Sequence, residues 1–432
     1  MCKGACIAAK IYVYEGRKHR HMKANGKRVV SRLNEIYQCG KKEDGTYTRM
    51  AFSAEDVKGR KLFASWAEAL GMTTRVDEGG NLIARMEGQD SSLPAILMGS
   101  HLDTVPDGGK YDGVLGCVGG LEVCETFKEE GYVPKHPVEV IVFTDEEGFR
   151  FGKGLTGSSA ICGQDAGISD SELDIYGEER GRVMQSYGIT SEGVKNAAKD
   201  PASVHCFVEL HVEQGARLYR TNTSVGVVSS IAGVNRYDVT VTGEANHAGS
   251  TAMADRKDAL VAAAGFINKI PEVTTEHGNE FTVATVGTIK VTPHSVNVIP
   301  GTCTFSLEIR DTEAHIMSLV EQKLQETLGD ICKKYEVSST FVPTSFHDPA
   351  PMSDWVKENI KKAVEELGID YSIIPSGAFY DSLIMTSVFP TAMIFVPSEN
   401  GVSHSRYEYT EDKDIENGCN VLLGTILNVD KL

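Results

Sequence analysis

The amino-acid sequence predicts an α/β protein with a mostly parallel central sheet and an inserted domain of ferredoxin-like βαββαβ order. The first observation is the length of 432 residues, which exceeds what one hydrophobic core usually supports. The second is a succession of short apolar segments separated by helical patterns, which is typical of parallel sheets. The third is a change of pattern from about Val228, followed at 235–245 by residues that alternate as in a half-buried strand.

Residues 53–71 predict the first helix of the larger domain, because Ser53 can cap its N-terminus and Gly71 can end it. Continuous apolar segments predict buried strands at 81–86, 94–100, 138–144 and 203–215. A glycine-rich helical pattern at 113–131 separates two of these strands, with its acidic residues expected on the outer face. In such parallel sheets, functional residues gather at the carboxyl ends of the strands.

The inserted domain follows the order of a ferredoxin-like domain. Its strands are expected at 235–245, 280–291, 302–311 and 338–343, and its helices at 254–270 and 313–336. The α/β pattern then returns with a helix at 353–368, a strand at 390–398 and a helix around 411–428. The predicted organisation is an N-terminal extension outside the core (1–29), a larger domain (30–229 and 346–432) and an inserted domain (230–345).

Composition excludes several classes of protein. The formal charge of -17 argues against a nucleic-acid or anionic-membrane partner. No apolar run approaches the roughly 20 residues that span a bilayer. The ten cysteines include no CxxC pair, so reduced thiols in the cytoplasm are expected. The basic segment 1–21 lacks the apolar core of a signal peptide and is either an extension or sequence upstream of a start at Met22.

Histidines and carboxylates follow four of the predicted strands of the larger domain. They are His101, Asp103 and Asp112; Asp145, Glu146 and Glu147; Glu209, His211 and Glu213; and Glu399, His404 and Glu408. Each group alone is ordinary for a solvated loop. Because parallel strands bring their ends to one edge of the sheet, the groups together predict a site for two divalent metal ions, with zinc, manganese, cobalt and nickel all compatible.

Charge and geometry suggest how such ligands divide. A carboxylate between two cations offsets their repulsion, and Asp112 follows a short loop suited to bridging. His101 and His211 could serve one ion, and a second pair, Glu147 and His404, the other.

Two further acidic residues are expected to assist these ligands. Asp103 is expected to bond the other nitrogen of His101 and set its tautomer. The ions make a bridging water acidic, and a base must still take its proton. Glu146 is the candidate, because it neighbours a ligand yet faces a different way.

Six motifs in order make the pattern recognisable. They are "GSHLDTVPDGGKYDG", "TDEEG", "ELHVEQG", "NHAGST", "HSVNVIPG" and "VSHS", and "RMAFSAEDVKGR" precedes them. Together they resemble the hydantoinase/carbamoylase amidases, within the wider M20 clan of metallopeptidases, from about Val30 to the C-terminus. The resemblance implies a catalytic domain like that of the di-zinc exopeptidases, with an inserted lid that forms a homodimer.

The resemblance also implies roles for individual residues. The metal ligands match His101, Asp112, Glu147, His211 and His404, with Asp112 bridging, and Glu146 matches the general base. His211 is similar to the carbamoylase branch, because clan peptidases commonly have a carboxylate there.

Residues expected to contact the substrate also come from the resemblance. His247 matches a residue that stabilises the oxyanion from the partner subunit. Asn297 and Arg310 match positions that hold the substrate carboxylate, which suits the fork of a guanidinium. Gln214 matches a position near the scissile group, and Gly377 one that offers backbone contact to the ligand.

The chain departs from the family pattern beside Gly377. Relatives often have "SGAGHDA" where this chain has "SGAFYDS", so Phe379 and Tyr380 replace a small residue and a histidine. A proline common after "HAG" is also missing from "HAGSTAM". The metal chemistry is expected to survive both changes, whereas the identity of the substrate depends on this pocket.

The predicted function is hydrolysis of the carbamoyl C–N bond of a ureido acid by a dinuclear metal centre. An N-carbamoyl-L-amino acid is the first expected substrate, and allantoate or ureidoglycolate come next. A clan aminopeptidase or dipeptidase is a second hypothesis, against which His211 counts. The third is a catalytically silent binding protein, which is disfavoured because the base and all five ligands are present.

Overall fold

The computed structural model describes residues 22–432 and divides them into two compact units. Unit 1 comprises the chain up to Ser229 together with Met352–Ile374 and Tyr380–Leu432. Unit 2 comprises Ser230–Pro351 and Pro375–Phe379. The expectation for residues 1–21 lies outside the described residues.

Unit 1 is built on one mixed sheet. Its strands follow the spatial order β1 (Thr73–Val76), β2 (Leu82–Met86), β4 (Val138–Phe143), β3 (Ala95–His101), β5 (Val204–Val212), β16 (Thr391–Val396) and β6 (Val225–Ile231), and β15 (Tyr371–Ser376) pairs with β6. The four central strands β4, β3, β5 and β16 are parallel, and the flanking pairs are antiparallel. The expected fold class, a mostly parallel central sheet in an α/β protein, is confirmed.

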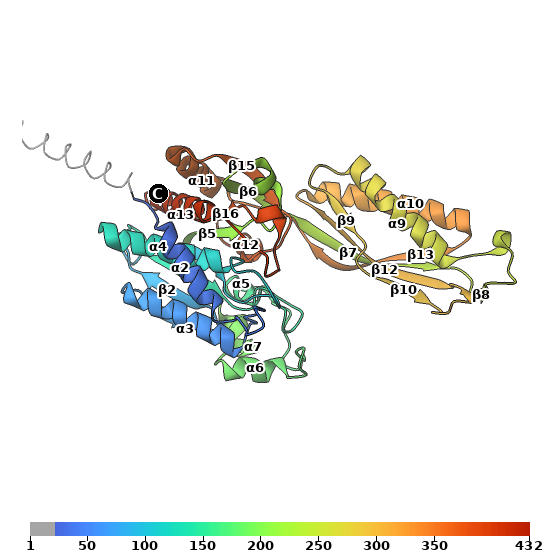
Figure 1. The fold of residues 1–432 in the computed structure, drawn as a ribbon, viewed down its shortest axis with the longest axis horizontal. Helices are drawn as coiled ribbons and strands as arrows, with labels where there is room; N and C mark the ends of the chain where they lie inside the picture. Colours follow the sequence, from blue (N-terminus) through green and yellow to red (C-terminus); the bar gives the residue numbers. More distant parts are fainter. Residues whose placement is uncertain (1–21) are drawn as a thin grey trace, which may run out of the picture. The chain divides into compact units, whose positions relative to one another are not determined.

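Helices flank this sheet (Figure 1). The longer ones are α2 (Gly26–Tyr37), α3 (Ala54–Ala69), α4 (Val114–Glu130), α11 (Asp354–Leu367) and α13 (Asp412–Val429). The shorter ones are α5 (Thr156–Ile161), α6 (Arg180–Ser186), α7 (Ser191–Asn196), α8 (Arg217–Thr221) and α12 (Asp381–Met385). Helix α3 begins where its sequence predicts, because the Ser53 side chain accepts a hydrogen bond from the Asp56 amide. Gly71 follows its end with a positive φ of 85°, as a C-terminal stop requires.

Helix α4 differs from the expectation that its acidic residues face outward. Glu122 is fully buried, and its carboxylate accepts hydrogen bonds from the guanidinium of Arg28 at 2.7 and 2.8 Å. The helix is buried along most of its length because helices α2 and α13 pack against it as well as the sheet. A buried carboxylate needs such a partner, and Arg28 on α2 supplies it.

The segment 22–29 also differs from the expectation that it lies outside the core. Met22, Ala24 and Val29 are buried, and the Ala24 amide donates a hydrogen bond to Asn420 on α13. Helix α2 is amphipathic and packs its apolar face on α4 and α13. Residues 22–29 therefore belong to the core of unit 1.

Unit 2 has its strands and helices in the βαββαβ order expected for a ferredoxin-like domain. Its sheet has the order β10 (Ile289–Thr292), β12 (Thr302–Asp311), β7 (Gly233–Thr242) and β13 (Ser338–His347), with β9 (Val283–Thr285) also paired to β12. Helices α9 (Ala259–His277) and α10 (Ala314–Tyr335) pack on this sheet. A separate ribbon of β8 (Asn246–His247) and β11 (Val298–Ile299) lies beyond one end of it (Figure 1). The expected strand at 280–291 is divided into β9 and β10.

Two general expectations concern cysteines and membranes. The eight cysteines that the structure describes are all unpaired. Within residues 22–432, no helix combines the length and apolarity that crossing a bilayer requires.

Two neighbouring histidine rings, tilted by 34° to each other, predict an acid-sensitive point in unit 1. The rings of His136 and His205 are 4.4 Å apart, and neither Nε2 atom has a hydrogen-bond partner among the described residues. Burial, assisted by His136 and Lys135 and opposed by Asp430, lowers the pKa of His205 below its usual 6.5. The unfolded chain therefore binds a proton at a higher pH than the folded chain does. The free energy of unfolding should fall as the pH drops below about 6.5.

The variant His205→Gln tests this prediction. We expect its melting temperature to fall less than that of the wild type between about pH 7.5 and about pH 5.5. His315→Gln, which changes an exposed histidine, serves as the control. Equal acid sensitivity of the wild type and His205→Gln would show that this pair is not responsible.

Candidate metal centre

The parallel strands of unit 1 bring the predicted ligands to one edge of the sheet. His101 is the last residue of β3, and His211 is next to last in β5. Glu147 follows β4 after a turn, and His404 follows β16 after a longer loop. Asp112 lies in the loop that leads from β3 into α4. Since these four strands run in the same direction, their ends meet at this edge.

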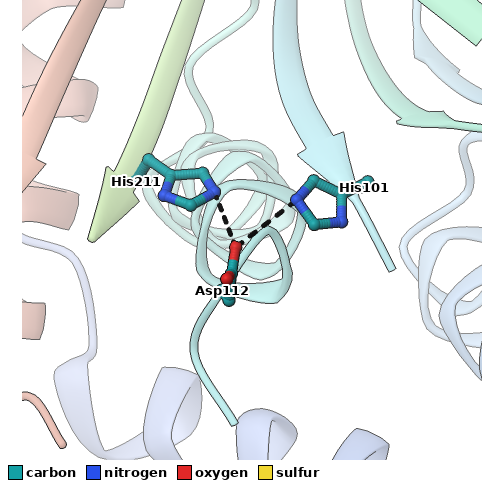
Figure 2. Close-up of side chains that lie close together, drawn as sticks. All are labelled: His101, Asp112 and His211. Carbon is teal, nitrogen blue, oxygen red and sulfur yellow. Dashed lines mark ion pairs between the residues drawn. The ribbon is translucent and has the colours of Figure 1, made fainter. Parts of the chain in front are cut away.

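Asp112 lies at the centre of the cluster. Its Oδ1 is 3.5 Å from Nε2 of His101 and 3.3 Å from Nε2 of His211 (Figure 2). Its Oδ2 is 3.2 Å from Nε2 of His404. The two oxygens of one carboxylate therefore face two different sets of histidines.

The remaining carboxylates complete these two sets. Nε2 of His404 is 3.6 Å from Oε2 of Glu147, and Nε2 of His101 is 3.6 Å from Oε2 of Glu146. Ligand atoms within 4.8 Å of one another form three groups: His101, Asp112 and His211; His101, Glu146 and Glu147; and Asp112, Glu147 and His404. The side chain of His404 is 52% exposed, whereas the others are at most 9% exposed, so the cluster is open on the His404 side.

The hydrogen bonds of two histidines test whether this cluster fits a metal ion. Nδ1 of His101 is 2.9 Å from the carbonyl oxygen of Asp103, and Nδ1 of His211 is 3.0 Å from that of Val212. A carbonyl only accepts, so each Nδ1 carries the proton and each Nε2 of a neutral ring presents a lone pair. Both Nε2 atoms face the oxygens of Asp112, and that of His211 also accepts the amide of Gly113 at 2.9 Å. Imidazole nitrogens and carboxylate oxygens that converge in this way form the donor set of a divalent metal site.

The pKa directions agree with this concentration of negative charge. Burial lowers the pKa of His101, but Glu146, Asp112 and Asp103 outweigh it and hold that pKa well above its usual value. Burial raises the pKa of Glu147 to about 7, and the nearby Asp112 adds to the effect. Glu146 is shifted in the same direction and also mainly by burial.

Asp103 takes a different contact from the one expected. Its carboxylate is 3.8 Å from Nδ1 of His101, beyond hydrogen-bond distance, and the His101 ring instead donates to the Asp103 carbonyl. The carboxylate accepts hydrogen bonds from the amides of Glu146 and Glu147 at 3.3 and 3.1 Å. Asp103 therefore orients the histidine through its backbone and the two glutamates through its side chain.

Unusual backbone conformations accompany the cluster. Asp145, Gln214 and His404 have φ values of 54°, 55° and 50°, a region that non-glycine residues rarely adopt. Gly113 has a φ of 65°, and a Cβ atom on it would lie 2.5 Å from the ring of His101. Strained residues of this kind concentrate at functional sites.

The third acid of "TDEEG" is paired away from the cluster. Asp145 is buried, accepts a hydrogen bond from Thr156 at 3.1 Å and lies 3.5 Å from the buried guanidinium of Arg180. Neighbouring residues in the turn thus face different partners. The sequence did not single out Arg180, because nothing in its local pattern distinguishes it from a surface arginine.

Glu408 joins two of the ligand loops, a role that was not assigned from the sequence. Its Oε2 accepts hydrogen bonds from the amides of Tyr111 and Asp112 at 2.8 and 3.1 Å. Its Oε1 accepts one at 2.7 Å from the hydroxyl of Ser403, which precedes His404. One buried carboxylate therefore holds the Asp112 loop and the His404 loop together.

Substitution of Glu408 should weaken metal binding. In Glu408→Ala, three donors lose their acceptor, and we expect roughly 10-fold to 100-fold lower metal affinity, as for other groups that orient ligands. Glu408→Gln keeps one carbonyl oxygen and should lose less. Competition with a chromogenic chelator measures both. Equal metal affinity in Glu408→Ala and the wild type would contradict this role.

Glu209 is a second buried carboxylate that was noted in the sequence without a role. It accepts hydrogen bonds from the hydroxyls of Ser100 at 2.7 Å and Ser382 at 2.6 Å, and from the Ser382 amide. Ser100 directly precedes His101, and Glu209 lies two residues before His211. A glutamate within an apolar strand is a sequence signal for such hydrogen bonds, because a buried carboxylate needs donors.

The predicted substrate residues divide between the two units. In unit 1, Nε2 of Gln214 donates to Oδ2 of Asp112 at 2.7 Å. In unit 2, Nδ1 of the exposed His247 accepts the amides of Gly249 and Ser250, each at 3.1 Å. Its Nε2 therefore carries the proton and can donate a hydrogen bond. Asn297 lies beside it, because its carbonyl accepts the amide of Ala248 at 2.9 Å.

Arg310 and Gly377 lie together at another place in unit 2. Nη1 of Arg310 donates to the carbonyl of Gly377 at 2.7 Å, and its Nε donates to Glu308 at 2.6 Å. The carbonyl of Gly377 thus contacts the arginine. Arg310 pairs with Val234 near one end of the β12–β7 ladder. The β8–β11 ribbon is connected to the other end, where Thr302 pairs with Thr242. Eight residues of strand separate the two ends, about 27 Å.

Comparison with known proteins places this geometry in a family. Residues 97–428 match the model of peptidase family M20/M25/M40. An N-carbamoyl-L-amino acid amidohydrolase of Geobacillus stearothermophilus is 38% identical over 401 residues, 93% of this chain and 98% of that protein. An allantoate amidohydrolase of Escherichia coli strain K12 is 34% identical, over 88% of this chain and 92% of the relative.

A solved structure gives the same result. An amidase of the hydantoinase/carbamoylase family from Burkholderia multivorans superposes with a TM-score of 0.87 at 32% identity, covering 94% of this chain and 98% of that one. The recognition made from the sequence motifs is confirmed. The chain belongs to peptidase family M20/M25/M40, a metal-dependent family, and within it to the hydantoinase/carbamoylase amidases, which are hydrolases of non-peptide C–N bonds.

Proposed function

We propose that the protein hydrolyses the carbamoyl C–N bond of an N-carbamoyl-L-amino acid, using two divalent metal ions. The observation that carries the proposal is the position of Asp112, whose two oxygens face separate sets of histidines. His101 and His211 would hold one ion, and Glu147 and His404 the other, with Asp112 between them. Zinc and manganese suit these mixed ligands, and cobalt and nickel are compatible.

When bound, the ions would supply Lewis acidity and bring the pKa of a coordinated water toward neutrality. Glu146 is then the proton acceptor, because its buried carboxylate lies among the ligand atoms and its amide is fixed by Asp103. The proton that Glu146 accepts from water passes to the departing nitrogen. One water and one carbamoyl acid yield the amino acid, ammonia and carbon dioxide.

The residues of unit 2 would bind the rest of the substrate. Arg310 and Asn297 hold the carboxylate, and the protonated Nε2 of His247 donates to the oxyanion. Arg310 and the strand end next to the ribbon beside Asn297 are separated by about 27 Å of strand, so we expect that the Arg310 and Asn297 side chains that bind one substrate come from two chains. This separation supports a homodimer in which His247 and Asn297 of the partner subunit complete the site.

A substrate panel tests the proposed reaction. Metal-reconstituted protein is incubated with N-carbamoyl-L-amino acids, allantoate, ureidoglycolate and dipeptides, and the release of ammonia or amine is measured. We expect the N-carbamoyl-L-amino acids to have the highest kcat/KM. Hydrolysis of dipeptides alone would replace the proposal with a peptidase, and faster hydrolysis of allantoate would replace its substrate.

Allantoate is the second candidate because a relative of that name matches 88% of this chain. A cytoplasmic location is proposed on the eight unpaired cysteines of the described residues, since reducing compartments keep thiols free. Neither a nucleic acid nor a membrane is proposed as a partner, given the formal charge of -17.

A further inference from the structure

Phe379 contacts the arginine proposed to bind the substrate carboxylate. Its ring centroid lies 5.4 Å from the guanidinium carbon of Arg310, within the range of a cation–π interaction. The ring of His347 lies against Phe379 edge to face, with centroids 5.4 Å apart. All three residues belong to unit 2, so one compact unit defines this arrangement.

The guanidinium of Arg310 is held from three directions. Its Nε donates a hydrogen bond to Glu308 at 2.6 Å, and its Nη1 donates one to the carbonyl of Gly377 at 2.7 Å. The Phe379 ring makes the cation–π contact from the third direction. Among the described residues, no acceptor bonds Nη2. The side chain of Arg310 remains 23% exposed. A fixed guanidinium with a free nitrogen is prepared to bind an incoming carboxylate.

A single short segment supplies both Gly377 and Phe379. It is tied to unit 2 by the Ala232 amide, which donates to the Ser376 carbonyl at 2.8 Å. Within it, the Ser376 hydroxyl bonds the carbonyl of Ala378 at 2.8 Å and accepts its amide at 3.1 Å. The segment that carries the ring is therefore held by hydrogen bonds up to the residue before Phe379.

The chemical structure of the substrate determines which of its groups would contact the Phe379 ring. In an α-amino acid the carboxylate and the side chain are attached to the same carbon. A ring beside the carboxylate-binding guanidinium therefore lies within reach of that side chain. An apolar side chain gains by covering the ring, whereas a polar ureido arm loses hydrogen bonds to water there.

We propose that Phe379 is a specificity-determining residue, which favours carbamoyl acids with an apolar substituent on the carbon that bears the carboxylate. The inference rests on the proposed function, because it takes Arg310 as the carboxylate anchor. It distinguishes apolar N-carbamoyl amino acids from N-carbamoylglycine, which has no side chain, and from allantoate, whose substituent is polar.

Two substitutions of Phe379 separate its apolar surface from its π-electrons. The measured quantity is the ratio of kcat/KM for N-carbamoyl-L-leucine to that for N-carbamoylglycine. We expect Phe379→Ala to lower this ratio at least about 10-fold, since it removes the apolar wall. Phe379→Leu should keep most of the ratio but raise KM for both substrates, because the ring that fixes Arg310 is lost. KM for the uncharged amide of N-carbamoyl-L-leucine should not change in Phe379→Leu.

Phe346→Leu is the matched control, because Phe346 lies in the same unit, is 55% exposed and packs its ring edge to face against Tyr237. Melting temperatures and metal content confirm that the variants are folded. A ratio within about 2-fold of the wild type in both Phe379 variants would overturn the inference while leaving the proposed function intact. If the wild type hydrolyses none of the carbamoyl acids, the proposed function and this inference are both wrong.

Discussion

Replacement of Glu146 by glutamine should abolish detectable hydrolysis while the protein keeps its metal. An amide cannot accept the proton of the attacking water, and removal of a general base costs roughly 100-fold to 10,000-fold in kcat. Glu146 also lies 3.6 Å from His101, but five other side chains remain to bind the ions. Turnover and metal content per chain are the two measurements.

Glu366→Gln is the control for this variant, because it makes the same chemical change on the exposed surface of α11. It should keep full activity. If Glu146→Gln loses metal together with activity, then Glu146 acts as a ligand. Unchanged turnover with full metal content would exclude Glu146 as the base.

Removal of metal should abolish activity and also lower the melting temperature. The carboxylates of Asp112 and Glu147 lie in one cluster, and the charge of Asp112 raises the pKa of Glu147, so without cations the two carboxylates repel each other. Ligands that bind the folded state stabilise it, by about 2.7 kcal/mol when present at about 100 times their Kd. Dialysis against a chelator followed by thermal unfolding measures this loss, and addition of zinc or manganese should restore both properties.

Asp112→Asn provides the comparison for metal removal. An amide is a poor bridge between two cations, so this variant should hold less metal than the wild type and show a smaller decrease in melting temperature on chelation. If chelation changes neither activity nor melting temperature in the wild type, the cluster does not bind a structural or catalytic metal.

The sequence motifs were sufficient to predict the family, the fold class and the reaction class. The reason is that each strand of a parallel sheet ends in the same direction, so residues after β3, β4, β5 and β16 meet wherever the exact register lies. Continuous apolar segments identified these strands well. The caps of helix α3 were also readable, because Ser53 and Gly71 act through local backbone bonds.

The burial of polar residues and their long-range contacts could not be predicted from the sequence. Glu122 resembles an outward-facing helical glutamate until Arg28, far away in the chain, packs over it. Segment 22–29 carries a weak local pattern and is buried because α4 and α13, the latter almost four hundred residues later, lie against it. The partner of a polar group depends on tertiary packing, which local periodicity does not encode.

The order of residues along the chain specifies which chemical groups meet at the sheet edge: three histidines and several carboxylates in an order typical of one amidase family. How these groups divide between partners depends on folding, because atoms of one side chain are distinguished by direction and distance. Folding assigned the two oxygens of Asp112 to different histidines, turned the Asp103 carboxylate toward the amides of Glu146 and Glu147, and set Phe379 against Arg310. These contacts join residues that are distant in the chain, so packing alone could create them.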